Sequence, residues 1–342
     1  MNFMLSSFVA MSIIFMSVFS TAKTNSKTIV FRVAHGPYEV VNEPLKIFKK
    51  EVEEKTNGKL KIQIEIPGVV KDTNTQAVKK TFEDVMSGKV QMSQLYTFYM
   101  TKFDPNFHAL EIPFLFKDHE HSFATVDGQP GKQLLASLEQ KSPLVGLGFT
   151  YCGGYRSVAS KDIKIEKVED LAKLKMTYLS PMSQAVFEKM GSSFVANINK
   201  EDIPSALMKN EINAYETVSP RYFYNAEYNT AKILNDLNHN IQFTVIVINK
   251  KFFNSLTKKE QIIISEASFK ASLVERKLAI QIADDVRNKA DKYGISIVKM
   301  PETEMKKFKD NMDKVDWSAK FGISKDFIET IRNLEPKKLS AN

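Results

Sequence analysis

TIVFRVAH, residues 28–35, and KLKIQIEI, residues 59–66, are the two segments that decide the fold class. The first is rich in β-branched and aromatic residues, and the second alternates apolar and polar residues, so both are predicted strands. Between them the apolar spacing predicts a helix with Pro44 in its first turn. A strand, a helix and a strand within about forty residues form a βαβ unit, which favours parallel pairing.

The alternation of strands and helices continues and divides into two series. The first series ends with the predicted strand 144–151, after which Gly153 and Gly154 permit a tight bend. A second series starts with a strand near 155–160, and the chain then returns to a strongly β segment at 235–248. Such a return after an inserted module predicts a first domain made from two separate stretches of the chain.

A long helix is predicted from the capping box at Thr257 to about Tyr293, which at 1.5 Å per residue spans roughly 50 Å. We therefore predict an α/β fold of two domains that are joined by crossing strands, clasped by this helix and separated by a hinged cleft. After a further helix at 302–314 we expect a polar tail. The predicted boundaries are 28–152 with 241–282 for domain I, 153–240 with 283–335 for domain II, and 336–342 for the tail.

The charge pattern argues against a nucleic-acid-binding protein. The formal net charge is +8, but Lys and Glu are interleaved along most of the chain, as on solvated helix faces. No motif that combines basic and aromatic residues accompanies the charge. The excess of positive charge can still raise the rate of encounter with anionic solutes.

The N-terminus has the layout of a secretory signal peptide. Residues 3–19 carry no charge, and the small residues Ser20 and Ala22 precede a plausible cleavage point at residue 22. We therefore predict a signal peptide at 1–22 and a periplasmic location. The stretch before the apolar run has no Lys or Arg, so an uncleaved membrane anchor remains the alternative.

Motifs for metal or covalent chemistry are weak. Cys152 is the single cysteine, so the protein has no internal disulfide, and no histidine-containing partner motif supports a catalytic thiol. His119 and His121 are two positions apart and point to different faces of a helix, so they cannot chelate a metal together. We expect no cofactor and no metal.

Residues at predicted strand ends are the candidate ligand contacts, because open α/β sheets bind ligands there. Arg156 follows a Tyr-Cys-Gly-Gly-Tyr bend at a domain crossing, where a guanidinium could bind a carboxylate through two hydrogen bonds. His35 closes a buried strand and is as consistent with a structural role as with a ligand contact. The predicted site comprises His35, Tyr96, Tyr151, Arg156, Thr177, Tyr178, Tyr215, Glu216 and Thr217.

Several segments resemble a known family. LEIPFLFKDHEHSFATVDGQPG, starting at Leu110, is similar to a proline-centred "LPFLF" segment, and EDLAKLKMTY and INAYETVSP are similar to "DLKGLKIRV" and "VDGQENP". The opening FRVAHG and the returning strand after His239 agree with the same family. Over about 28–335 the chain resembles the extracytoplasmic solute-binding proteins of tripartite ATP-independent periplasmic (TRAP) transporters, the dicarboxylate-binding family.

The resemblance implies a periplasmic-binding-protein-like fold and a non-enzymatic role in transport. Such a protein captures a small organic solute between its domains and delivers it to the membrane subunits of the transporter, without nucleic acid or cofactor. It would act as a monomer or as a homodimer. A secreted α/β enzyme and a ligand-sensing module for a membrane receptor remain the alternative functions.

The departures from the family bear on the solute. Thr177 stands where the family has an arginine that pairs with the substrate carboxylate, and Thr217 stands where it has an asparagine. Glu216 and the second basic position, Arg156, are retained. Losing a buried charged partner for a carboxylate typically costs about 2–5 kcal/mol, whereas a threonine hydroxyl returns about 0.5–1.5 kcal/mol. We therefore expect a less charged solute, or an acid that is anchored elsewhere.

Overall fold

The computed structural model describes residues 26–34, 38–66, 75–177 and 179–336. The predicted βαβ unit is present: β1 (Lys27–Arg32) and β2 (Leu60–Glu65) pair in parallel, with Ile29 opposite Ile62, and α1 (Tyr38–Lys55) connects them. The prediction that Pro44 lies in the first turn is wrong, because the helix already begins at Tyr38. The predicted signal peptide lies outside the described residues.

The first sheet has the order β2-β1-β3-β9-β4. β1 and β3 are parallel, whereas β9 pairs antiparallel with both β3 and β4, so the returning strand lies inside the first sheet as predicted. The elements of this half are β3 (Met92–Tyr96), η1 (Thr97–Lys102), η2 (Pro105–Glu111), α2 (Thr75–Ser87), α3 (His119–Asp127), α4 (Gln129–Lys141), β9 (Ile241–Asn249) and α8 (Lys250–Asn254), where η marks a 3₁₀-helix.

The second sheet has the order β10-β8-β4-β7-β5-β6. The predicted β segment 235–248 is divided, because β8 pairs in this sheet, β9 in the other, and residues 236–240 cross between them. The elements of this half are η3 (Val168–Lys173), β5 (Lys175–Thr177), α5 (Pro181–Lys189), β6 (Ser193–Val195), η4 (Lys200–Asp202), α6 (Ile203–Met208), β7 (Ala214–Val218), α7 (Ser219–Tyr224), η5 (Glu227–Asn229), β8 (Ile233–Asn235) and β10 (Ser296–Val298).

Strand β4 (Leu144–Ser160) belongs to both sheets. The sequence predicted two strands separated by a bend, but the structure has one strand with a register shift between Tyr151 and Gly154. Gly153 and Gly154 have φ angles of 115° and 84°, which residues with a side chain rarely adopt. The shift lies where β4 leaves β9 and begins to pair with β7, so Arg156 is the first residue in register with the second sheet.

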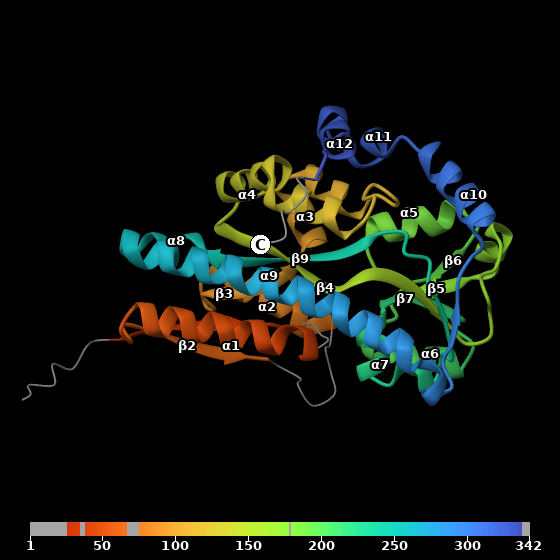
Figure 1. Cartoon of the computed structure of the whole chain (residues 1–342), viewed down its shortest axis with the longest axis horizontal. Helices are drawn as coiled ribbons and strands as arrows, with labels where there is room; N and C mark the ends of the chain where they lie inside the picture. Colours follow the sequence, from red (N-terminus) through yellow and green to blue (C-terminus); the bar gives the residue numbers. More distant parts are fainter. Residues whose placement is uncertain (1–25, 35–37, 67–74, 178, 337–342) are drawn as a thin grey trace, which may run out of the picture.

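The long helix α9 (Lys258–Lys289) runs across the strands of both sheets (Figure 1). Thr257 and Glu260 form the predicted capping box at its start, and the turn η6 (Ala290–Tyr293) continues it to the predicted end. The helix packs against α1 of the first half, β4, and α7 of the second half. Its predicted span over both halves is confirmed, and the overall arrangement is the predicted two-domain α/β fold.

The C-terminal part is more structured than the sequence indicated. After α10 (Glu302–Asp313) we expected a polar tail, but two short helices follow, α11 (Trp317–Phe321) and α12 (Lys325–Arg332). Buried apolar side chains of these helices are Trp317, Phe327, Ile328 and Ile331, and α12 packs on α4 of the first half. The contact joins the C-terminal segment to the first half, and the assignment of 283–335 to the second domain stays a prediction.

The IPFLF segment packs against the crossing segment 236–240. Phe114 has a positive φ of 58°, which is unusual for a bulky residue. Its backbone N–H donates to the carbonyl oxygen of His239 at 2.7 Å, and its ring meets that of Phe308 edge to face. The IPFLF segment, which is the most specific sequence motif, therefore packs on the segment that crosses between the two sheets.

Candidate functional site

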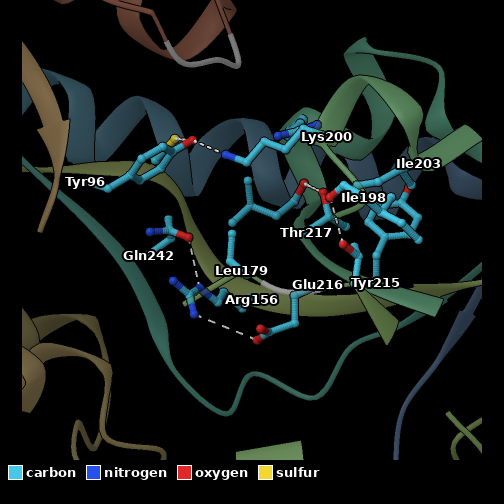
Figure 2. Close-up of a pocket in the computed structure, with 14 residues that line it drawn as sticks. Tyr96, Arg156, Leu179, Ile198, Lys200, Ile203, Tyr215, Glu216, Thr217 and Gln242 are labelled. Carbon is cyan, nitrogen blue, oxygen red and sulfur yellow. Dashed lines mark hydrogen bonds and ion pairs between the residues drawn. The ribbon is translucent and has the colours of Figure 1, made fainter. Parts of the chain in front are cut away.

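A cavity lies where β3, β4, β7 and β9 meet the segments between β5 and α6 (Figure 2). It is narrow, with a volume of about 40 Å³. Both halves of the molecule contribute to its wall, which is the arrangement expected of a cleft between two α/β domains. The lining residues are Tyr96, Cys152, Arg156, Thr177, Leu179, Ile198, Lys200, Ile203, Tyr215, Glu216, Thr217, Val218, Arg221 and Gln242.

Arg156 is almost fully buried at the base of this cavity. Its Nε donates to Gln242 Oε1 at 2.9 Å, and its Nη2 donates to Glu111 Oε1 at 2.8 Å. Among the described residues, its Nη1 has no hydrogen-bond partner and lies 3.9 Å from Glu216 Oε1. The two-bond clamp expected from the sequence is therefore not free, since one terminal nitrogen is already used and only Nη1 is left.

Arg156 is paired with two buried carboxyl groups, those of Glu111 and Glu216. Oε1 of Glu216 lies at hydrogen-bond distance, 2.8 Å, from His239 Nε2, and Oε2 of Glu216 accepts a hydrogen bond from Ser183 Oγ. Glu111 also accepts from Ser180 Oγ at 3.1 Å, and burial raises the pKa of its carboxyl even though Arg156 acts in the opposite direction. Glu216 thus serves to hold Arg156 and the crossing segment at His239.

The two threonines that replace family residues use their hydroxyls within the protein. Thr177 Oγ1 donates to the carbonyl oxygen of Ile198 at 3.1 Å. Thr217 Oγ1 donates to Glu227 Oε2 at 3.2 Å, and the hydroxyl of Tyr215 donates to the same oxygen at 2.9 Å. The hydroxyl hydrogen of Thr177 is therefore not available to a solute in this arrangement.

The sequence reasoning missed two basic residues in the wall, Lys200 and Arg221. Lys200 belongs to η4, and its Nζ lies 3.3 Å from the hydroxyl of Tyr96 and 4.5 Å from the centre of that ring. Arg221 belongs to α7, and its Nε donates to Glu227 Oε1 at 2.8 Å. Lys200 lies five residues after the end of β6 and Arg221 three residues after the end of β7, each already inside a helix, so a search of the strand ends themselves did not find them.

The other predicted site residues have different positions. Tyr151 lies in the core, where its hydroxyl meets Ser122 and its ring packs on Phe123 and Phe243. Successive side chains of a strand alternate between faces, so Cys152 faces the cavity and Tyr151 faces away from it. His35 and Tyr178 lie outside the described residues.

Covalent and metal chemistry find little support in the cavity. Burial raises the pKa of the Cys152 thiol to about 11, so the thiol stays protonated at neutral pH. His119 and His121 contact different partners, the hydroxyl of Tyr151 and the carbonyl oxygen of Ile331. No group of three potential metal ligands is found within the described part of the chain.

Comparison with known proteins identifies the family. The family model for bacterial extracellular solute-binding protein, family 7 (DctP), matches residues 33–319. The chain belongs to this family. The predicted membership of the solute-binding proteins of TRAP transporters is thereby confirmed, and the protein is a transport component of the solute-binding class. Among the residues that the structure describes, no helix is both long and apolar enough to cross a membrane.

Two named relatives are similar over much of the chain. The 2,3-diketo-L-gulonate-binding periplasmic protein YiaO of Escherichia coli is 24% identical over 284 residues, which cover 83% of this chain and 84% of the relative. The C4-dicarboxylate-binding periplasmic protein DctP of Rhodobacter capsulatus is 25% identical over 215 residues, or 61% of each chain.

Solved structures of TRAP periplasmic and sugar-acid-binding proteins share the fold. A Sulfitobacter protein with bound β-D-galacturonate has a TM-score of 0.79 at 22% identity and covers 90% of this chain and all of its own. A protein of Advenella mimigardefordensis in complex with galactonate has a TM-score of 0.81 at 20% identity and covers 90% and 97%. A Shewanella oneidensis protein with bound succinate has a TM-score of 0.79 at 19% identity and covers 90% and 98%.

Proposed function

We propose that this chain captures a small organic acid in the cavity between its two domains and delivers it to the membrane subunits of a TRAP transporter. The observation that carries the proposal is Nη1 of Arg156, a buried donor at the cavity wall that has no hydrogen-bond partner among the residues that the structure describes. A buried, unpaired guanidinium nitrogen is costly unless something bonds to it, and a solute oxygen would do so.

The ligands of the relatives support this choice of solute. Galacturonate, galactonate, succinate and 2,3-diketo-L-gulonate are all carboxylates, and three of the four also carry several hydroxyl or oxo groups. We propose that the solute lies among the described site residues that line the cavity: Tyr96, Arg156, Thr177, Tyr215, Glu216 and Thr217.

Closure about a hinge is the proposed mechanism. We take 28–152 with 241–282 as one domain and 153–240 with 283–335 as the other, joined at the register shift of β4 and at the segment before β9. Tyr96 comes from one side and Lys200 from the other, and both line the cavity, so their contact joins the two sides at its wall. A solute that bridges the two sides would shift the population towards the closed form.

The experiment is a thermal-shift panel on the exported, mature protein. The panel contains mono- and dicarboxylates of two to six carbons, with and without hydroxyl and oxo groups, together with their neutral analogues. At least one acid should stabilise the protein, because a ligand at one hundred times its Kd adds about 2.7 kcal/mol. Mass spectrometry of the solute that co-purifies would identify the natural ligand.

The matched variants are Arg156→Gln and the surface substitution Arg332→Gln. The ligand-induced shift should vanish in Arg156→Gln and persist in Arg332→Gln, each compared with its own baseline without ligand. The proposal would be contradicted if only the neutral compounds of the panel stabilised the protein. It would also be contradicted if the ligand-induced rise in melting temperature were as large in Arg156→Gln as in the wild type.

We further propose that the protein has no catalytic role and is exported through cleavage after residue 22. The protonated Cys152 thiol supports the first point. Turnover of any acid in the panel would contradict it, and the N-terminal sequence of protein recovered from the periplasm tests the second.

A further inference from the structure

Lys200 and Arg221 place two basic side chains on one side of the cavity. Both residues line it, and both lie near the same neighbours, Tyr96 and Cys152. Arg221 uses its Nε for Glu227, and no hydrogen bond of its two terminal nitrogens is found among the described residues. Two parallel N–H groups of this kind are the geometry that arginine offers to a carboxylate.

The side at Arg156 has a different charge balance. Arg156 is held between Glu111 and Glu216, so one guanidinium faces two carboxyl groups there. An added carboxylate would meet their negative charge as well as the single free Nη1. A neutral oxygen, such as a hydroxyl or an oxo group, can accept from Nη1 without that repulsion.

The two sides are separated by the width of the cavity. Figure 2 shows the ammonium group of Lys200 and the guanidinium of Arg156 on opposite sides of it. Both residues line the same cavity, and Arg156 is near enough for its charge to act on the pKa of Lys200. A solute that spans this cavity would have one end at Lys200 and the other at Arg156.

We propose that Lys200 and Arg221 bind the carboxylate of the solute, and that Arg156 and Gln242 contact its neutral oxygens. The solute class is then a monocarboxylate with hydroxyl or oxo groups at the far end. This inference rests on the proposed function and adds the orientation of the solute. It also explains how the site can hold a carboxylate although Thr177 stands where the family has an arginine. The hydroxyl of Thr177 donates its hydrogen bond to the carbonyl oxygen of Ile198.

The electrostatics of Lys200 agree with an anion site. Burial, followed by the charge of Arg221, lowers the pKa of Lys200 to about 7. The other groups that act on it are Cys152 and Glu227, which favour its charged form, and Arg156, which opposes it. A carboxylate beside Lys200 would restore its charge, so binding should take up a proton above pH 7.

The test is calorimetric titration of the full mature protein with D-gluconate, D-glucitol and succinate, together with the acid of the thermal-shift panel that stabilises it most. In Lys200→Met and Arg221→Gln the affinity for the best acid should fall roughly 10- to 1,000-fold. Lys209→Met, which removes one exposed charge outside the cavity, should leave that affinity unchanged. If Arg221→Gln does not fold, Arg221→Lys replaces it in the test, because it keeps the charge but removes the two parallel N–H groups of the guanidinium.

The dependence on pH gives a second readout. The affinity of the wild-type protein for the acid should fall as the pH rises from 6 to 9, and this slope should disappear in Lys200→Met. The acids themselves remain ionised throughout this range, because carboxyl groups titrate near pH 4.

The outcomes separate the two proposals. The inference is overturned if Lys200→Met and Arg221→Gln bind the acid as tightly as Lys209→Met does. If binding is then lost only in Arg156→Gln, the proposed function stands. Binding of succinate more tightly than of every monocarboxylate would also overturn the inference. If the wild-type protein binds no acid of the panel, both proposals fail.

Discussion

Nη2 of Arg156 lies 2.8 Å from Oε1 of Glu111, and both side chains are buried. The pair joins β4, at the point where it enters the second sheet, to the end of η2 in the first half. Arg156 is thus both a wall of the cavity and part of the connection between the two halves. Its role in binding and its role in stability have to be measured separately.

Replacing Arg156 should destabilise the fold without ligand. Arg156→Gln leaves Glu111 and Glu216 buried without their cation, and breaking a buried pair in this way costs about 3–5 kcal/mol. The free energy of unfolding from urea titration at pH 7 measures the loss. Adding Glu111→Gln to Arg156→Gln should recover part of it. A loss no larger than that of Arg332→Gln would show that the pair adds no stability.

Replacing Lys200 should stabilise the protein without ligand. Its pKa is about 7 in the folded state against 10.5 for an ordinary lysine, so the unfolded chain binds more protons between these values. The stability of the wild-type protein should therefore rise with pH from 7 to 10.5, and the full penalty is present below pH 7.

We expect Lys200→Met to be more stable than the wild type by about 1–3 kcal/mol at pH 6, after allowing for the partial exposure of the side chain. This advantage should shrink towards pH 10. Urea unfolding at pH 6 and pH 9.5, with Lys209→Met as control, measures it. An equal difference at both pH values would mean that Lys200 does not titrate in this window.

The hydroxyl of Thr177 should matter more for the fold than for binding. Thr177→Val keeps the shape and removes the hydrogen bond to Ile198, which is worth about 0.5–1.5 kcal/mol. The affinity for the best acid should change by less than about threefold, a difference below 1 kcal/mol. A much larger loss of affinity in calorimetry would place the solute on this hydroxyl instead.

Gly153 should tolerate a side chain far less well than Gly294. Both have positive φ, but a Cβ at Gly153 would lie 2.6 Å from Val218 Cγ2, whereas nothing lies within 4 Å of one at Gly294. We expect Gly294→Ala to cost about 1–2 kcal/mol through backbone strain alone, and Gly153→Ala to cost more. Thermal unfolding of the two variants compares them, and equal losses would exclude a contribution from Val218.

Glu275 should make the protein less stable as the pH rises. Glu275 lies on the buried face of α9, where burial raises the pKa of its carboxyl well above the usual value, and Gln94 Nε2 lies 2.6 Å from its Oε1. Above about pH 4.5 the unfolded chain loses the proton that the folded protein keeps, so stability falls with rising pH by at most about 1.4 kcal/mol per unit.

Glu275→Gln should remove this dependence of stability on pH. Its free energy of unfolding should therefore increase relative to that of the wild type as the pH rises from 5 to 8. Glu266→Gln, an exposed position on the same helix, is the control. Parallel stability curves of Glu275→Gln and the wild type over this range would show that the carboxyl is ionised in the fold.

The sequence predicted the features that arise from neighbouring residues. The period of TIVFRVAH and KLKIQIEI gave the βαβ unit, the capping box at Thr257 gave the start of α9, and the IPFLF motif identified the family. Strand period, helix caps and motifs all act over a few residues, so they can be recognised in one chain without its fold.

The tertiary structure decided how the charges are partnered. Arg156 was found from its place after a strand, but its partners Glu111 and Gln242 lie 45 and 86 positions away. Lys200 and Arg221 come from short helices that meet Tyr96 only in the folded molecule. Charge pairing depends on distance and burial in space, which local sequence patterns do not contain. The sequence by itself therefore determined the family, and only the fold determined that Arg156, Lys200 and Arg221 come together in the wall of one cavity.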